Sequence, residues 1–135
     1  MFEHLHPKLV HFPIALVITA MILDVMGSIV KKDALHHAAR YVFNLAAFFS
    51  ILSLFTGLAE ADRLHLNHPV LLAHRSYAFV LTVFSVIFSV ALFFIPERYK
   101  RPIFTIMLLI CTVLVVATGH YGGQMVYGYG IGIDG

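Results

Sequence analysis

Residues 6 to 30 read HPKLVHFPIALVITAMILDVMGSIV, and this stretch decides the fold. Two histidines, His6 and His11, lead directly into an apolar run that is long enough to cross a lipid bilayer as a helix. Pro7 suits the first turn of that helix, because the first helical N–H groups have no intrahelical partner. Pro13 removes the N–H that would bond the carbonyl of Leu9, so we expect a local distortion close to His11.

The composition is that of an integral membrane protein. Of the 135 residues, 60% are hydrophobic and 12% are charged, and the mean hydropathy is +0.89, whereas roughly a quarter of the residues in a soluble domain are charged. A chain of this length holds four spans of about 20 residues with short connections. The net charge of +2 includes no basic run, so no nucleic-acid partner is expected. The first residues lack the basic region of a signal peptide, so we expect the first segment to be retained.

The hydropathy pattern predicts one all-α domain over residues 1–135, an integral membrane four-helix up-down bundle with short loops. The predicted spans lie at about 8–30, 38–60, 70–94 and 103–123. Charged residues predict turns at 31–33 and 97–101, and Pro102 is expected to open the fourth helix. The segment 119–123 is predicted to be a turn, followed by a Gly-rich C-terminal tail that caps the bundle at the membrane interface.

Two predicted helices carry polar residues at helical spacing. On the second helix these residues are Ser50, Ser53, Gly57 and Glu60. On the third helix they are His74, Thr82, Ser85 and Ser89. Small and hydroxyl-bearing residues in such stripes are typical of helix–helix contacts in lipid, so both stripes are expected to face the bundle interior. Packing accounts for the serines but leaves Glu60 without an explanation.

The basic residues predict the orientation of the chain in the membrane. Six belong to the side of the first and third turns, namely Lys31, Lys32, Arg40, Arg98, Lys100 and Arg101. The other side has Lys8, Arg63 and Arg75. The positive-inside rule therefore places both turns in the cytoplasm and both termini in the periplasm, as a multi-pass protein of a bacterial inner membrane. Asp24 is a carboxylate inside an apolar span, and such groups usually face the bundle interior. We interpret it instead as an interfacial partner of the lysines at 31 and 32, because it lies near the end of the span.

The expected periplasmic side gathers residues that can hold a redox cofactor. His11, His74 and His120 are expected at comparable depths on three helices, and His6 is a further candidate. A heme b in a helix bundle needs two neutral imidazoles on different helices, with small residues beside them to make room for the macrocycle. We therefore predict a heme b electron-transfer subunit. If it exchanges electrons with a quinone, Glu60 or Asp62 would take the proton released on quinol oxidation.

Two alternatives use the same pattern differently. Three imidazoles and a carboxylate, supplied by His11, His74, His120 and Glu60, suit a Zn, Cu or Fe ion. A cofactor-free subunit that anchors a larger redox complex would also tolerate these histidines, since His-Pro before a helix can be an N-terminal cap. A hydrolytic enzyme has little support, because no serine lies in a Gly-x-Ser-x-Gly turn.

The opening His6-Pro7-x-x-Val10-His11-Phe12-Pro13, a histidine at the start of the third span and the Gly-rich ending together resemble the DUF2231 family of small bacterial four-span membrane proteins. The resemblance covers essentially the whole chain. It implies a context of membrane electron transfer, because such modules are found beside Rieske, c-type cytochrome or cupredoxin domains. Because a chain this small often works inside a complex, we expect a larger redox complex or a homo-oligomer as the partner. His6, His11 and His74 match the motif histidines, whereas other residues often occupy the position of His120.

Overall fold

The computed structural model describes residues 5–63 and 67–131. Its elements are α1 (Leu5–Leu9), α2 (His11–Val30), α3 (Asp33–Arg63), α4 (Pro69–Ala91), α5 (Glu97–Gly123) and a short π-helix, η1 (Gln124–Gly128). The described residues form no strand, and four helices are long and apolar enough to cross a membrane. The prediction of an all-α membrane bundle is confirmed.

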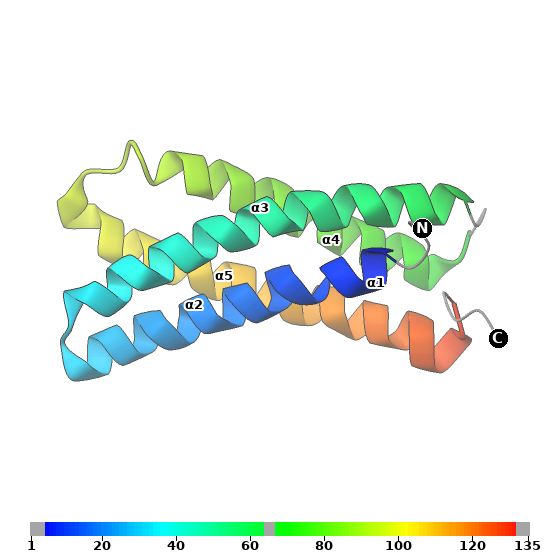
Figure 1. Ribbon diagram of the computed structural model, residues 1–135, viewed down its shortest axis with the longest axis horizontal. Helices are drawn as coiled ribbons and strands as arrows, with labels where there is room; N and C mark the ends of the chain where they lie inside the picture. Colours follow the sequence, from blue (N-terminus) through cyan, green and yellow to red (C-terminus); the bar gives the residue numbers. More distant parts are fainter. Residues whose placement is uncertain (1–4, 64–66, 132–135) are drawn as a thin grey trace.

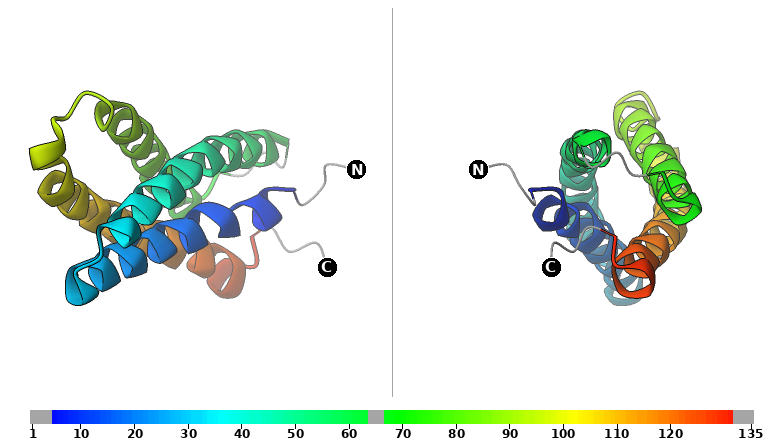
Figure 2. Two further views of the ribbon diagram at one scale, coloured as in Figure 1. Left: turned by 60° about the vertical axis from the view of Figure 1, so that its left-hand side comes forward. Right: turned by 90° about the vertical axis from the view of Figure 1, so that its right-hand side faces the viewer.

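The four long helices pack in an up-down bundle. Each packs against its neighbour in the sequence, and α2 also packs against α5, which closes the ring (Figure 2). The start of α1 and the end of η1 lie at the same end, together with the end of α3 and the start of α4 (Figure 1). We call this the terminal end. The turns between α2 and α3 and between α4 and α5 lie at the opposite end, which we call the basic end because of its Lys and Arg residues.

The first helix is interrupted close to the position expected from the sequence. Val10 separates α1 from α2, and its N–H still donates to the carbonyl of His6 at 3.0 Å. Pro13 is buried and offers no N–H to the carbonyl of Leu9. The short helix α1 packs against α3, and this contact places His6 beside the interior of the bundle.

The last helix differs most from the prediction. It begins at Glu97, so Pro102 lies inside the helix instead of opening it. A proline this close to a helix start costs only one hydrogen bond, near the membrane surface. The predicted turn at 119–123 is also wrong. The helix continues through Gly123 in ordinary helical geometry and passes into η1, and positive φ among the described glycines first occurs at Gly130.

The interior has an aromatic centre and polar flanks. Phe43, Phe88 and Phe104 contact one another with ring centres 5.6 to 6.1 Å apart, closer to the basic end; Phe43 meets the other two rings edge-on. Towards the terminal end the buried residues include Ser50, Ser53, Thr82, Ser85 and Thr118. The two predicted stripes therefore do face inward, where their small side chains allow close helix packing.

Candidate functional site

His6 is fixed against α3 at the terminal end. Its Nδ1 lies 2.9 Å from the carbonyl oxygen of Ser53, and since a carbonyl can only accept, Nδ1 donates its proton there. The neutral ring then carries its free lone pair on Nε2. The imidazole also packs on Gly57, where a Cβ atom would lie only 2.7 Å from Cε1 of the ring. The position of this histidine therefore depends on a glycine in the facing helix.

His74 is held in the same way by a different pair of helices. Its Nδ1 donates to the carbonyl oxygen of Thr118 on α5 at 2.9 Å, which again leaves Nε2 as the free lone pair. A Cβ atom on Gly122 would lie 3.2 Å from Cε1 of this ring. Each histidine thus combines one carbonyl acceptor with one glycine contact.

The two rings come close to each other inside the terminal end. Their centres are 6.4 Å apart, and their planes make an angle of 75°. Two imidazoles that bind one metal ion from opposite sides, with bonds of about 2 Å, have ring centres roughly 6 Å apart. Both side chains are half-buried, and Ser53 Oγ is a buried hydroxyl with no partner among the described residues. The distance between the ring centres is close to the one that two histidine ligands of a single metal ion would have.

The other predicted site residues are not part of this pair of rings. His11 is exposed on α2, and Asp62 is exposed near the end of α3, while Glu60 is half-buried. His120 is exposed on α5, where its Nε2 lies 3.1 Å from the side-chain amide of Gln124. Within residues 5–63 and 67–131, no three His, Cys, Asp or Glu side chains form a group that could hold a metal ion.

The side chain of His68 caps the N-terminus of α4. Its Nδ1 accepts a hydrogen bond from the backbone N–H of Val70 at 3.2 Å, and Pro69 is the first helical residue. This is the N-terminal cap arrangement that the His-Pro pair suggested. The ring of Tyr129 lies against His68, with centres 4.5 Å apart, so the end of η1 covers the start of α4.

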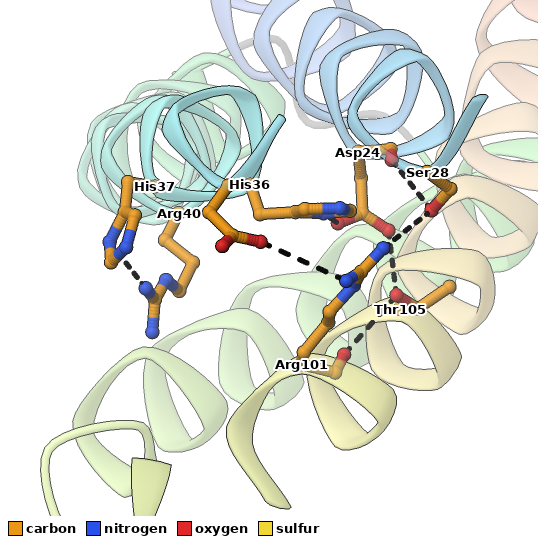
Figure 3. A network of polar contacts seen from close by, with 8 residues as sticks. Asp24, Ser28, His36, His37, Arg40, Arg101 and Thr105 are labelled. Atoms are coloured by element: carbon orange, nitrogen blue, oxygen red, sulfur yellow. Dashed lines mark hydrogen bonds and ion pairs between the residues drawn. The ribbon is translucent and has the colours of Figure 1, made fainter. Parts of the chain in front are cut away.

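A second polar cluster lies inside the basic end (Figure 3). Asp24 is 1% exposed and accepts a hydrogen bond from His36 Nδ1 at 2.6 Å and another from the hydroxyl of Thr105 at 2.7 Å. The interpretation of Asp24 as an interfacial partner of lysine is therefore wrong, because the carboxylate points into the bundle. The ring of His36 packs on Gly27, where a Cβ atom would lie 2.9 Å from Nε2. This cluster joins α2, α3 and α5.

The sequence of the chain matches a known protein family. A family model described as a predicted membrane protein (DUF2231) matches residues 3–135. The chain belongs to the DUF2231 family. The family predicted from the opening histidine motif is thereby confirmed. No curated protein and no solved structure matches this DUF2231 chain.

The sequence of this DUF2231 protein contained no simple signal for the Asp24–His36 pair. Asp24 lies eight residues before Lys32, the centre of the turn, and His36 lies four residues after it. In an antiparallel helical hairpin, equal spacing about the turn would have paired Asp24 with Arg40 instead. The contact between Asp24 and His36 therefore depends on the packing of the helices and could not be predicted by counting residues from the turn.

Proposed function

We propose that this DUF2231 protein is a membrane electron-transfer subunit in which His6 and His74 hold a heme b near the terminal end. The observation that carries the proposal is the pair of imidazoles on two different helices, each with Nδ1 bonded to a backbone carbonyl and with ring centres 6.4 Å apart. Such hydrogen bonds fix the tautomer and the ring orientation of a ligating histidine and raise its basicity.

The surroundings of the two histidines support the proposal. Gly57 and Gly122 present no side chain to the rings, and a Cβ atom at either position would press on an imidazole. When bound, a heme would supply one-electron chemistry, at a potential set by the histidine pair and by the apolar environment. The chain itself would orient the ligands and limit access of water.

The orientation and partners are part of the same proposal. The larger number of Lys and Arg residues at the basic end supports a cytoplasmic location for that end in a bacterium, with the terminal end in the periplasm. The half-buried Glu60 and the exposed Asp62 lie on the last turns of α3, at the terminal end. A quinone that docks there would find a carboxylate to take its proton. A larger redox complex would supply the second electron partner.

Absorption spectroscopy of the detergent-purified protein tests this function. The expected result is sharp reduced α and Soret bands, with about one heme per chain in a pyridine hemochrome assay. His6→Ala and His74→Ala are expected to lose the heme, whereas His120→Ala should keep it, because His120 is exposed and its Nε2 contacts the side-chain amide of Gln124. A double variant lacking both His6 and His74 that still binds heme would remove the proposal.

Elemental analysis of the same preparation distinguishes a heme from a bare metal ion. The two free Nε2 lone pairs would also suit Zn, Cu or Fe with further ligands. A featureless spectrum with about one equivalent of such a metal, lost in the His6→Ala variant, would replace the heme with a metal centre. A featureless spectrum without metal would leave the anchor function.

A further inference from the structure

The basic end contains a pocket of about 330 Å³ that the proposed heme site does not use. Its walls come from α2, α3 and α5, and the Asp24–His36 pair forms part of the lining (Figure 3). A pocket of this size is at the lower end of the range for small-molecule sites. Four cationic side chains line it, namely Arg40, Arg98, Lys100 and Arg101.

The charges of the lining favour an anion. Three carboxylates also line the pocket, but Asp24 is already bonded to His36 and Thr105. The carboxylates of Asp33 and Glu97 are 85% and 65% exposed, so water screens them strongly. In addition, α3 and α5 both begin at this end, and the N-terminus of a long helix carries a partial positive charge.

Glu97 forms ion pairs with two of the cationic side chains that line the pocket. One of its oxygens lies 3.1 Å from Nη1 of Arg40, and the other lies 2.6 Å from Nζ of Lys100. The two cationic side chains are each only 19% exposed, whereas the carboxylate between them is mostly exposed. The carboxylate therefore approaches two partly buried cations from the solvent side, and it can swing away without opening the bundle.

The guanidinium of Arg101 makes only long contacts with its polar neighbours among the described residues. It lies 3.9 Å from the carboxylate of Asp33 and 3.5 Å from the hydroxyl of Ser28, both long contacts for a charged donor. Figure 3 shows this group reaching from α5 towards α2 and α3. A guanidinium offers paired N–H donors that match the oxygens of a phosphate.

We propose that this pocket binds a phosphate ester, with Arg40, Lys100 and Arg101 as its ligands and Glu97 as an internal competitor. The group is either the headgroup phosphate of an anionic phospholipid, since the pocket lies at an end of the membrane-spanning bundle, or a soluble phosphomonoester. The volume of the pocket is larger than that of a lone phosphate ion, which favours a phosphate ester. This inference does not depend on the heme.

Thermal unfolding of the detergent-purified full chain tests the proposal, with the buried thiol of Cys111 as the reporter. Glycerol 3-phosphate is titrated against sodium chloride at equal ionic strength, and the protein in nanodiscs of phosphatidylglycerol is compared with that in phosphatidylcholine. We expect a saturable rise of the unfolding midpoint with one of the two phosphate sources. A response to glycerol 3-phosphate identifies a soluble ester, and a response confined to phosphatidylglycerol identifies a lipid.

Three variants make the test specific. Arg101→Gln removes a charged donor and should weaken binding about tenfold. Glu97→Gln removes the competitor and should strengthen binding about threefold or more, a gain that misfolding cannot produce. Lys32→Gln removes an exposed cation of the same end that does not line the pocket, so its affinity should match that of the unaltered protein.

Several outcomes would overturn the proposal. One is the absence of any midpoint shift with either phosphate source beyond that seen with chloride and phosphatidylcholine. Another is an equal loss of affinity in Lys32→Gln and Arg101→Gln, because that would indicate attraction by surface charge alone. Unchanged affinity in Glu97→Gln would remove the role of Glu97 as a competitor.

Discussion

At the scale of single residues, each of the two histidines at the terminal end has one ring nitrogen that is hydrogen-bonded and one that is not. Nδ1 of His6 and of His74 is committed to a backbone carbonyl, and Nε2 remains free. The contacts with Gly57 and Gly122 limit the orientations that the two rings can adopt.

Gly57→Ala tests whether that orientation matters. The new Cβ atom would lie 2.7 Å from Cε1 and 2.9 Å from Nδ1 of His6, and the ring cannot yield without losing its bond to the carbonyl of Ser53. We expect a loss of about 1–2 kcal/mol in the free energy of unfolding and a clear fall in heme bound per chain. Thermal unfolding and the hemochrome assay measure the two effects.

Gly119→Ala is the matched control. Gly119 also lies in a long helix, but a Cβ atom there would meet no atom within 4 Å. Alanine is the better helix former by about 1 kcal/mol, so this variant should be as stable as the unaltered protein or slightly more so. If the two substitutions lowered the heme content equally, the contact between Gly57 and His6 would have no special role.

At the scale of helices, the sequence predicted the existence of the elements better than their ends. Long apolar runs force four spans, because a backbone in lipid must satisfy its own hydrogen bonds. The start of α5 was misplaced because Pro102 was given more weight than the charged residues before it, which form the first turn of the helix. The segment 119–123 was misjudged because glycine permits a turn without requiring one.

For the site too, the sequence predicted the region better than the individual residues. Hydropathy and spacing put histidines at the terminal end, but depth alone could not choose among His6, His11, His74 and His120. The choice depends on which ring turns inward, and this follows from the break at Val10 and from the packing of α1 on α3. Only His6 and His74 are brought together with their rings in contact range.

The Asp24 cluster joins α2, α3 and α5 at the basic end, and a substitution of Asp24 tests how much it stabilises their packing. Asp24→Ala leaves Nδ1 of His36 without an acceptor inside the bundle, whereas the hydroxyl of Thr105 keeps the carbonyl oxygen of Arg101 at 3.2 Å. Breaking such a buried pair costs about 3 kcal/mol or more. We expect a markedly lower thermal midpoint, measured by the reactivity of the Cys111 thiol, which is 0% exposed in the folded chain. Asp62→Ala, which removes an exposed carboxylate of α3, should leave the midpoint unchanged.

At the scale of the whole molecule, the bundle separates two polar ends with different chemistry. The terminal end holds the paired imidazoles, and the basic end holds the phosphate pocket and the Asp24 cluster. Between them, nearest to the basic end, the buried rings of Phe43, Phe88 and Phe104 fill the interior. A continuous polar path from one end to the other would have to cross this aromatic layer, so the two ends are expected to act independently.

The orientation in the membrane decides which compartment each end serves, and two exposed tyrosines make it measurable. Tyr99 lies at the basic end and Tyr129 at the terminal end, 48% and 57% exposed. In a Cys111→Ala background, a membrane-impermeant maleimide applied to intact spheroplasts should label Tyr129→Cys but not Tyr99→Cys. Permeabilised cells should label both. The opposite pattern would place the histidine pair in the cytoplasm and the phosphate pocket outside, against the positive-inside rule, and an electron partner would then have to be sought on the cytoplasmic side.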